Sequence, residues 1–358
     1  MRATPGALFC VLGAAASLPA DYSTVPVVDL AAPAVTSTAA VAAALREYGF
    51  FYITNHGVPA SLIEAQFDAA RGLFALPAEA KRAMPFDSAL DIGYLAAGGQ
   101  ALDEESGVGD TKEGFTLTNN GVFNASFRLT PSDPLAGAQL RWPPADALPE
   151  YEPTLRAYTA ALTRVNHELN ALLFAALGLG EADRRALASQ PFTVTKQLRY
   201  APRARDAPAA AADDGGAPRA LGAGAHADWG ALTILATDGT PGLEVEHPRA
   251  GWLGVPPRAG ALIVNAGDQI AHWTNGEFRS ANHRVVVASS TPRYSTAFFT
   301  YFDLHATVAP LPQFVTRERP PLRRAETTLE YFHFKLRESV GGSAPAQDDT
   351  SPNCPRDA

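Results

Sequence analysis

The sequence predicts an α+β fold in which a barrel of short strands is braced by helices. From residue 192 to residue 301, short apolar runs are separated by Gly, Pro, Asn and Asp, a pattern typical of all-β barrels. From residue 149 to residue 179, apolar residues recur at intervals of three and four, the period of an amphipathic helix. We therefore expect a jelly-roll barrel (double-stranded β-helix) with an N-terminal α/β region and bracing helices.

The N-terminal region alternates strands and helices. Residues 25–30 and 50–54 are short apolar runs that we expect to be strands. Between them, a helix fits from Thr38 as N-cap to Tyr48 and ends at Gly49. Residues 55–59 should form a turn into a second helix that holds Leu62, Ile63, Phe67 and Leu73.

The barrel follows the long helix. Asn275-Gly276 between two of its apolar runs predicts a hairpin turn. The expected strands span residues 192–200, 232–235, 243–245, 251–253, 261–264, 283–288 and 294–301.

Three segments are expected to lie outside the folded core. Residues 1–20 combine Arg2 with a short apolar stretch and small residues, which fits either a cleaved signal or transit peptide or a disordered extension. Residues 203–224 are rich in Ala, Asp, Gly and Pro and predict a flexible insertion. Residues 341–358 are expected to form a disordered tail.

The predicted regions are an extension (1–20), an N-terminal region (21–130), bracing helices (131–190), a jelly-roll core (191–312), a C-terminal helix (313–340) and a disordered tail (341–358).

Three residues of the barrel region could hold a metal ion. His226 and Asp228 are two residues apart, so in a strand their side chains would share a face. His283, which opens a later apolar run, is the best third ligand. Two His and one carboxylate leave coordination positions open, as in non-haem Fe(II) oxygenases, although zinc accepts the same ligands.

Arg293 and Ser295 predict a binding site for a carboxylate. They are also two residues apart in an apolar run and should face one cavity. A buried guanidinium needs a partner and pairs best with a carboxylate. No acidic residue lies nearby in sequence, so either the fold or a dicarboxylate ligand must supply one.

These residues, in this order, resemble the iron(II)- and 2-oxoglutarate-dependent dioxygenases, specifically the isopenicillin N synthase-like branch. The residues around them agree with that resemblance. The matching pieces are residues 222–226, 242–245, 265–268, 273–276 and 283–285.

The resemblance implies a jelly-roll enzyme with Fe(II) held by His226, Asp228 and His283. It also implies 2-oxoglutarate bound by Arg293 and Ser295, with Tyr200 reaching its carboxylate. Many plant members have an Asn two residues before this tyrosine, whereas this chain has Leu198. Tyr94 and Phe115 lie in segments that border the substrate pocket in this branch.

The implied reaction is oxidation of a small organic molecule by hydroxylation, desaturation or ring closure. O2 and 2-oxoglutarate would be consumed, succinate and CO2 formed, and ascorbate could serve as reductant. Two alternatives stay open: an iron oxidase of the same branch that does not use 2-oxoglutarate, and a barrel that binds a small ligand without turnover. The remaining histidines that we expect to be structural or superficial are His56, His167, His247, His272 and His305.

Composition argues against several kinds of partner. The chain has 358 residues and a formal net charge of −8, whereas nucleic acids and anionic membranes favour a basic surface. We expect a small-molecule substrate, no nucleic acid or membrane partner, and a monomer. Only two cysteines occur, Cys10 and Cys354, so the core can fold in a reducing compartment and we expect a cytoplasmic location.

Overall fold

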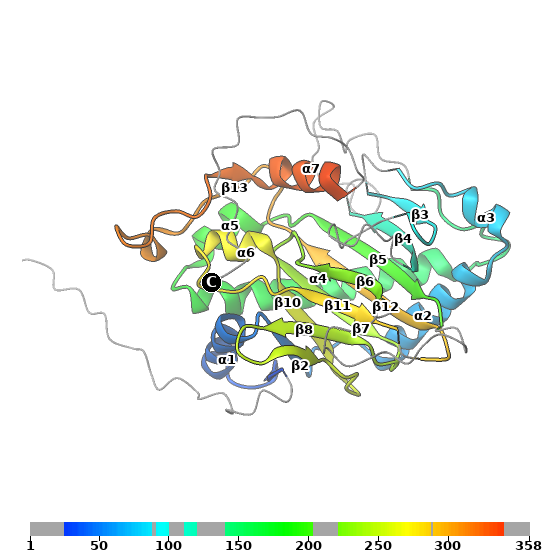
Figure 1. Ribbon diagram of the computed structural model, residues 1–358, viewed down its shortest axis with the longest axis horizontal. Helices are drawn as coiled ribbons and strands as arrows, with labels where there is room; N and C mark the ends of the chain where they lie inside the picture. Colours follow the sequence, from blue (N-terminus) through cyan, green and yellow to red (C-terminus); the bar gives the residue numbers. More distant parts are fainter. Residues whose placement is uncertain are drawn as a thin grey trace, which may run out of the picture.

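The computed structural model describes residues 25–87, 91–99, 111–119, 140–202, 221–287 and 289–339. Two sheets form the centre of the molecule (Figure 1). The larger sheet contains, in spatial order, β1 (Val27–Asp29), β2 (Phe50–Thr54), β10 (Leu262–Ala266), β7 (Leu232–Thr237), β12 (Arg293–Thr300), β5 (Thr193–Tyr200), β4 (Lys112–Thr118) and β3 (Gly93–Leu95). The smaller contains β6 (Leu221–His226), β11 (His283–Val286), β8 (Leu243–His247) and β9 (Gly251–Gly254).

The two sheets form the predicted jelly-roll barrel. Strands β1 and β2 are parallel, and the other paired strands of both sheets are antiparallel. Side chains from both sheets line one cavity between them. Strands β1 to β4, from the predicted N-terminal region, extend the same large sheet that holds the core strands.

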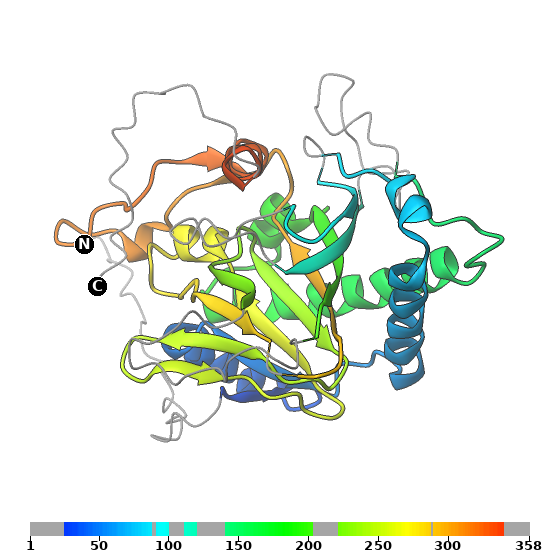
Figure 2. The same cartoon turned by 45° about the vertical axis from the view of Figure 1, so that its right-hand side comes forward.

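Helices cover the outer face of the larger sheet (Figures 1 and 2). The long α4 (Tyr151–Ala176) matches the predicted bracing helix, because its buried residues follow the spacing of three and four. It packs against α1 (Ala34–Glu47) and α2 (Ala60–Ala75). The other helices are α3 (Ala78–Arg82), α5 (Glu181–Ala188), α6 (Asp268–Trp273), the 3-10 helix η2 (Pro312–Phe314) and α7 (Thr328–Ser339).

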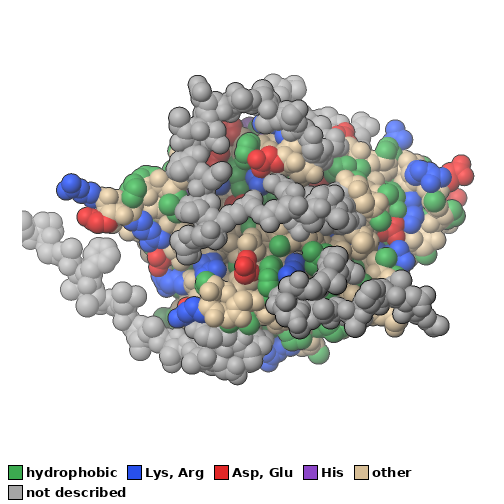
Figure 3. All heavy atoms as spheres, in the orientation of Figure 1, with side chains coloured by type: hydrophobic (Ala, Val, Ile, Leu, Met, Phe, Trp, Pro, Cys, Tyr) green, Lys and Arg blue, Asp and Glu red, His purple; other side chains and the backbone are tan. Residues whose placement is uncertain are grey.

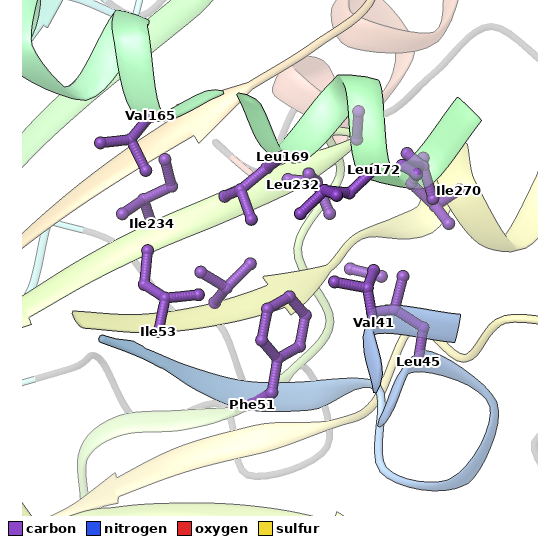
Figure 4. Close-up of a cluster of buried hydrophobic side chains, with 14 of the residues drawn as sticks. Val41, Leu45, Phe51, Ile53, Val165, Leu169, Leu172, Leu232, Ile234 and Ile270 are labelled. Atoms are coloured by element: carbon purple, nitrogen blue, oxygen red, sulfur yellow. The ribbon is translucent and has the colours of Figure 1, made fainter. Parts of the chain in front are cut away.

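A cluster of aliphatic and aromatic side chains joins these helices to the sheet (Figure 4). Each fully buried side chain of this size contributes roughly 1.5–3 kcal/mol relative to an exposed one. The cluster therefore holds the larger sheet as a rigid wall behind the cavity. Its labelled members are Val41, Leu45, Phe51, Ile53, Val165, Leu169, Leu172, Leu232, Ile234 and Ile270.

The start of α1 differs from the prediction. The helix begins at Ala34, so Thr38 lies inside it and is not its N-cap. Pro33 precedes the first helical residue with φ −51°, and the fixed φ of proline suits a helix start. The helix ends as predicted before Gly49, whose φ is +68° and where a Cβ would lie 2.6 Å from the backbone oxygen of Arg279.

Asn275 and Gly276 do not form the predicted hairpin turn. Both have positive φ, 51° and 79°, as the sequence suggests, but they follow α6 and do not join two paired strands. The backbone N–H of Gly276 donates to the carbonyl of Ala271 at 2.7 Å. Residues with a left-handed backbone conformation commonly end helices in this way. The local sequence alone does not distinguish a hairpin turn from the end of a helix.

The peripheral segments have mixed outcomes. Residues 221–224, predicted as part of a flexible insertion, belong to strand β6. Residues 1–20, 203–220 and 341–358 lie outside the described residues. The predicted C-terminal helix is α7, which follows a small sheet of β13 (Thr307–Val308) and β14 (Glu326–Thr327).

The surface carries both signs of charge. On the face in Figure 3, Lys and Arg side chains outside the grey atoms are interspersed with Asp and Glu side chains. Within the described ranges, none of the helices combines the length and the apolar character needed to cross a membrane.

Candidate active site

His226, Asp228 and His283 converge in the cavity between the two sheets. His226 ends β6, His283 begins β11, and the two are directly paired across these antiparallel strands. The spacing predicts a strand position for Asp228, but Asp228 lies in the loop after β6. One ligand atom from each residue lies within 4.8 Å of the others, and this is the one such group in the described part of the chain.

The two imidazoles direct the same nitrogen toward Asp228. The Nδ1 of His226 lies 2.8 Å from the carbonyl oxygen of Gly224, and the Nδ1 of His283 lies 3.2 Å from that of Ala281. Donation from Nδ1–H to these carbonyls leaves each Nε2 with a free lone pair. The Nε2 atoms lie 3.9 Å and 3.6 Å from Asp228 Oδ1.

The other oxygen of Asp228 is held by protein donors. Thr233 Oγ1 donates to Asp228 Oδ2 at 2.6 Å, and Asn265 Nδ2 donates to the same oxygen at 2.7 Å. Both donors are buried. The carboxylate is therefore oriented with Oδ2 toward the protein and Oδ1 toward the imidazoles, which fits a metal ion between the three side chains.

The protonation states of these groups also suit a metal. Burial and the charge of the neighbouring His283 together lower the pKa of His226 to about 3. Burial alone would raise the pKa of Asp228, but the two histidines and the hydrogen bonds from Asn265 and Thr233 lower it. At neutral pH the site thus offers a neutral imidazole and an ionised carboxylate, the forms that bind metals.

Arg293 lies in the same cavity without a protein partner for two of its nitrogens. Its Nε and Nη1 atoms are buried and have no hydrogen-bond partner among the described residues. The guanidinium carbon lies 4.8 Å from the centre of the Tyr200 ring, which belongs to the directly opposed residue of β5. An unpaired buried guanidinium is costly, so this end of the cavity could hold an anionic ligand.

Ser295 shares the cavity face of β12 with Arg293, as their spacing predicts. Its side chain is 2% exposed. Leu198 is paired with it on β5 and also lines the cavity. Leucine cannot donate a hydrogen bond, so Ser295 and Tyr200 are the hydroxyl-bearing residues of these two strands that line the cavity.

The cavity between the two sheets extends beyond these groups. The volume open to the centre of a water molecule inside it is about 100 Å³. The sequence did not single out several residues that line it. These are Phe50, Asp91, Lys112, Lys196, Trp229, Thr233, Asn265, Phe299 and Tyr301. Strict alternation along residues 196–200 would have predicted that Lys196 lines the cavity, because Lys196 shares a face of the strand with Tyr200.

Tyr94 and Phe115 do not line this cavity, so the expectation that they border the pocket is wrong. Phe115 is fully buried in a separate cluster with Tyr151, and Tyr94 donates a hydrogen bond to Glu113. In β4, Phe115 and Lys112 are three residues apart and therefore point to opposite faces. Lys112 is the one that faces the cavity.

The remaining histidines are not part of the cluster. His56 accepts a hydrogen bond from the backbone N–H of Val58 at 3.2 Å, as expected of a turn residue. His247 packs against Tyr48, His272 lies near Glu326, and His305 is exposed.

Two family models match the chain. The 2OG-Fe(II) oxygenase superfamily model matches residues 196–301, and the model of the N-terminal region of non-haem dioxygenases in morphine synthesis matches residues 25–144. The first match contains every residue discussed above as a metal or anion ligand. The second match covers strands β1 to β4, which extend the large sheet, and helices α1 to α3.

Similar proteins are found in fungi, plants and bacteria. A 2-oxoglutarate-dependent dioxygenase of Didymella fabae is 34% identical over 287 residues, covering 78% of this chain and 81% of the relative. Gibberellin 3-beta-dioxygenase 1 of Arabidopsis thaliana is 30% identical over 91% of this chain and 84% of its own. A crystal structure from Caulobacter crescentus, assigned to the 2OG-Fe(II) oxygenase family, is 25% identical with a TM-score of 0.73, covering 88% and 99% of the two chains.

Proposed function

This chain belongs to the 2OG-Fe(II) oxygenase superfamily and is a 2-oxoglutarate-dependent dioxygenase, and on that basis we propose which of its residues hold the iron and the co-substrate. His226, Asp228 and His283 bind Fe(II) through Nε2, Oδ1 and Nε2. Arg293, Ser295 and Tyr200 bind the distal carboxylate of 2-oxoglutarate. When bound, iron and 2-oxoglutarate supply the chemistry that oxidises a small organic molecule with O2.

One observation carries the assignment of the co-substrate. Arg293 is 4% exposed, and its Nε and Nη1 have no partner in the described residues. A carboxylate fits the planar fork of a guanidinium through two parallel hydrogen bonds. Ser295 adds a hydroxyl donor from the same strand face. This arrangement supports use of 2-oxoglutarate over the alternatives of a 2-oxoglutarate-independent oxidase or a non-catalytic barrel.

The protein's own part in the reaction is to bind, orient and exclude water. Thr233 and Asn265 hold the carboxylate of Asp228 in one orientation. Phe50 packs its ring edge-on against His283, with 5.3 Å between the ring centres, and so limits rotation of that imidazole. No side chain is assigned as a general acid or base.

The test compares Arg293→Lys with the wild type. Lysine keeps the positive charge but loses the paired geometry, and charge-assisted hydrogen bonds contribute about 1.5–3 kcal/mol each. We expect 2-oxoglutarate to bind the iron-loaded protein about 10 to 100 times more weakly, measured without O2 by calorimetry. Iron affinity should not change.

Arg323→Lys is the matched control. Arg323 lies over the Tyr331 ring at 4.4 Å and pairs with Glu326, outside the cavity lining. It should leave 2-oxoglutarate binding unaltered. Equal affinity of the Arg293→Lys variant and the wild type, or substrate turnover by the wild type without 2-oxoglutarate, would refute the assignment.

We further propose that the protein acts as a monomer in the cytoplasm, with ascorbate as an auxiliary reductant. The large hydrophobic side chains that are exposed among the described residues are Val27 on β1, Val35 on α1, Leu322 between η2 and β14, and Phe334 on α7. Light scattering after size-exclusion chromatography tests the monomer. Cell fractionation tests the location, and turnover with and without ascorbate tests the reductant.

A further inference from the structure

A buried ion pair lies in the wall of the cavity, apart from the residues discussed so far. Lys196 Nζ lies 3.0 Å from Asp91 Oδ1, and the two side chains are 18% and 4% exposed. Both residues line the cavity. Neither belongs to the proposed iron ligands or to the proposed binding site of the co-substrate.

The pair lies away from the Arg293 end of the cavity. On β5 the cavity-facing residues alternate as Lys196, Leu198 and Tyr200. Lys196 is four residues from Tyr200, about 13 Å along a strand, and Tyr200 is the residue opposite Arg293. The space between the pair and the co-substrate is therefore the space left for the substrate.

The pair and the proposed iron ligands line one cavity, and the buried Tyr301 lines it with them. A substrate group bound at Asp91 would therefore leave the rest of the molecule in the same cavity as the metal ligands.

The backbone holds Asp91 in an uncommon conformation. Its φ is 51°, a left-handed value that few residues other than glycine adopt. The next residue, Ile92, forms an antiparallel β-bridge with Asp87, and Gly93 packs so tightly that a Cβ would lie 2.3 Å from the carbonyl oxygen of Pro85. Residues held in such conformations concentrate at functional sites.

Stability alone does not account for the pair. A buried ion pair is often no more stabilising than apolar residues of similar volume. A second buried pair in this chain, Lys81 and Glu113, shows the contrast, because Glu113 also accepts hydrogen bonds from Tyr94 and Arg199. The contact between Asp91 and Lys196 uses one of three ammonium donors and one of about four acceptor positions of the carboxylate.

We propose that Asp91 and Lys196 bind a hydroxyl group of a ring-shaped substrate. This inference rests on the proposed function and names the substrate class. A hydroxyl can donate to the carboxylate and accept from the ammonium at once. The pair is neutral overall, so a substrate carboxylate would face Asp91 and a substrate ammonium would face Lys196 without a compensating charge. Val194, Trp229, Phe299 and Tyr301 provide apolar and aromatic walls for a ring.

The test uses four ring compounds that differ in one group. 4-Ethylphenol, 4-ethyltoluene, 4-ethylbenzoate and 4-ethylbenzylamine are titrated without O2 into the protein loaded with Fe(II) and 2-oxoglutarate. We expect the wild type to bind the phenol about ten times more tightly than each of the others, the effect of one charge-assisted hydrogen bond. Lys196→Met and the double variant Asp91→Asn/Lys196→Met should lose this preference. Asparagine tolerates the left-handed backbone at position 91.

The control is the double variant Lys81→Met/Glu113→Gln, which breaks a buried ion pair outside the cavity lining. This variant should keep the preference for the phenol. The inference is overturned if the wild type does not prefer the phenol over 4-ethyltoluene, or if the double variant keeps the preference. The affinity for 2-oxoglutarate, measured in the same samples, reports on the proposed function separately, because it depends on Arg293 and should be equal in the wild type and the double variant.

Discussion

The side chain of Asn265 donates a hydrogen bond of 2.7 Å to Asp228, a residue 37 positions earlier in the chain. Asn265 lies on β10, next to β7, which carries the second donor Thr233. The larger sheet therefore orients a carboxylate whose histidine partners come from the smaller sheet. The candidate metal site depends on how the two sheets face each other.

Asn265→Ala should weaken iron binding without unfolding the protein. Loss of a partner that orients a metal ligand typically costs 10- to 100-fold in metal affinity, and we expect a decrease of about that size. Competition with a chelator under anaerobic conditions measures it. Asn55→Gly is the control, because Asn55 donates an equally short bond to the exposed Asp29 and has a positive φ that glycine adopts freely. A variant of Asn265 with wild-type iron affinity would contradict this role.

Replacing any one of the proposed iron ligands by alanine should remove tight iron binding. We expect His226→Ala, Asp228→Ala and His283→Ala each to lower iron affinity by about 100-fold or more, because two ligands hold a metal weakly, while the circular dichroism spectrum stays that of the wild type. His305→Ala, at an exposed position, is the matched control. Full turnover by Asp228→Ala would exclude these residues as the metal site.

Gly222 lies on β6 of the smaller sheet, and Gly222→Ala should weaken 2-oxoglutarate binding. A Cβ at Gly222 would lie 2.5 Å from Cδ1 of Tyr200 and 2.9 Å from a methyl group of Val287. Such overpacking costs typically 1–3 kcal/mol, and we expect it to displace the Tyr200 ring that lies beneath Arg293. The dissociation constant for 2-oxoglutarate should rise about three- to tenfold.

The control for this substitution is Gly254→Ala on β9. A Cβ there would have no neighbour within 4 Å, so co-substrate binding should not change. If both variants bind 2-oxoglutarate like the wild type, Tyr200 does not contribute to the site.

Glu113 should contribute stability that depends on pH. Burial alone would raise its pKa, but hydrogen bonds from Lys81, Tyr94 and Arg199 lower it below the ordinary 4.5. Because the folded protein binds this proton less tightly, the contribution is complete above pH 4.5 and is lost as the pH falls through the lowered value. At pH 7, Glu113→Gln should reduce the free energy of unfolding by on the order of 1–3 kcal/mol.

The difference in the free energy of unfolding between wild type and Glu113→Gln should therefore become smaller as the pH falls below 4.5. Urea unfolding at several pH values measures it. Glu152→Gln, in an exposed ion pair with Arg156, should show a difference near zero throughout. If the difference in the free energy of unfolding stays constant with pH, the charge of the Glu113 carboxylate is not the source of its contribution to stability.

Regular periodicity made much of the fold predictable. The spacing along α4 and the density of short strands predicted the bracing helix and the barrel, because each depends on which residues face the core. Alternation also placed Arg293 and Ser295 on one face of β12. The sequence also offered His283 as the third ligand, but spacing cannot show which strands are neighbours, so the pairing of His283 with His226 was not predicted.

Other features were decided by tertiary contacts. Asn275 and Gly276 have the backbone conformation that their sequence favours, yet they end a helix because the strands that would make a hairpin are not adjacent. Asp91 carries no local signal, and its position in the cavity beside Lys196 joins two residues that are distant in the chain. The sequence alone determined which residue types lie on each face, because side-chain direction follows local backbone geometry. Only the tertiary structure decided which faces meet, because packing and long-range pairing join residues that are far apart in the chain.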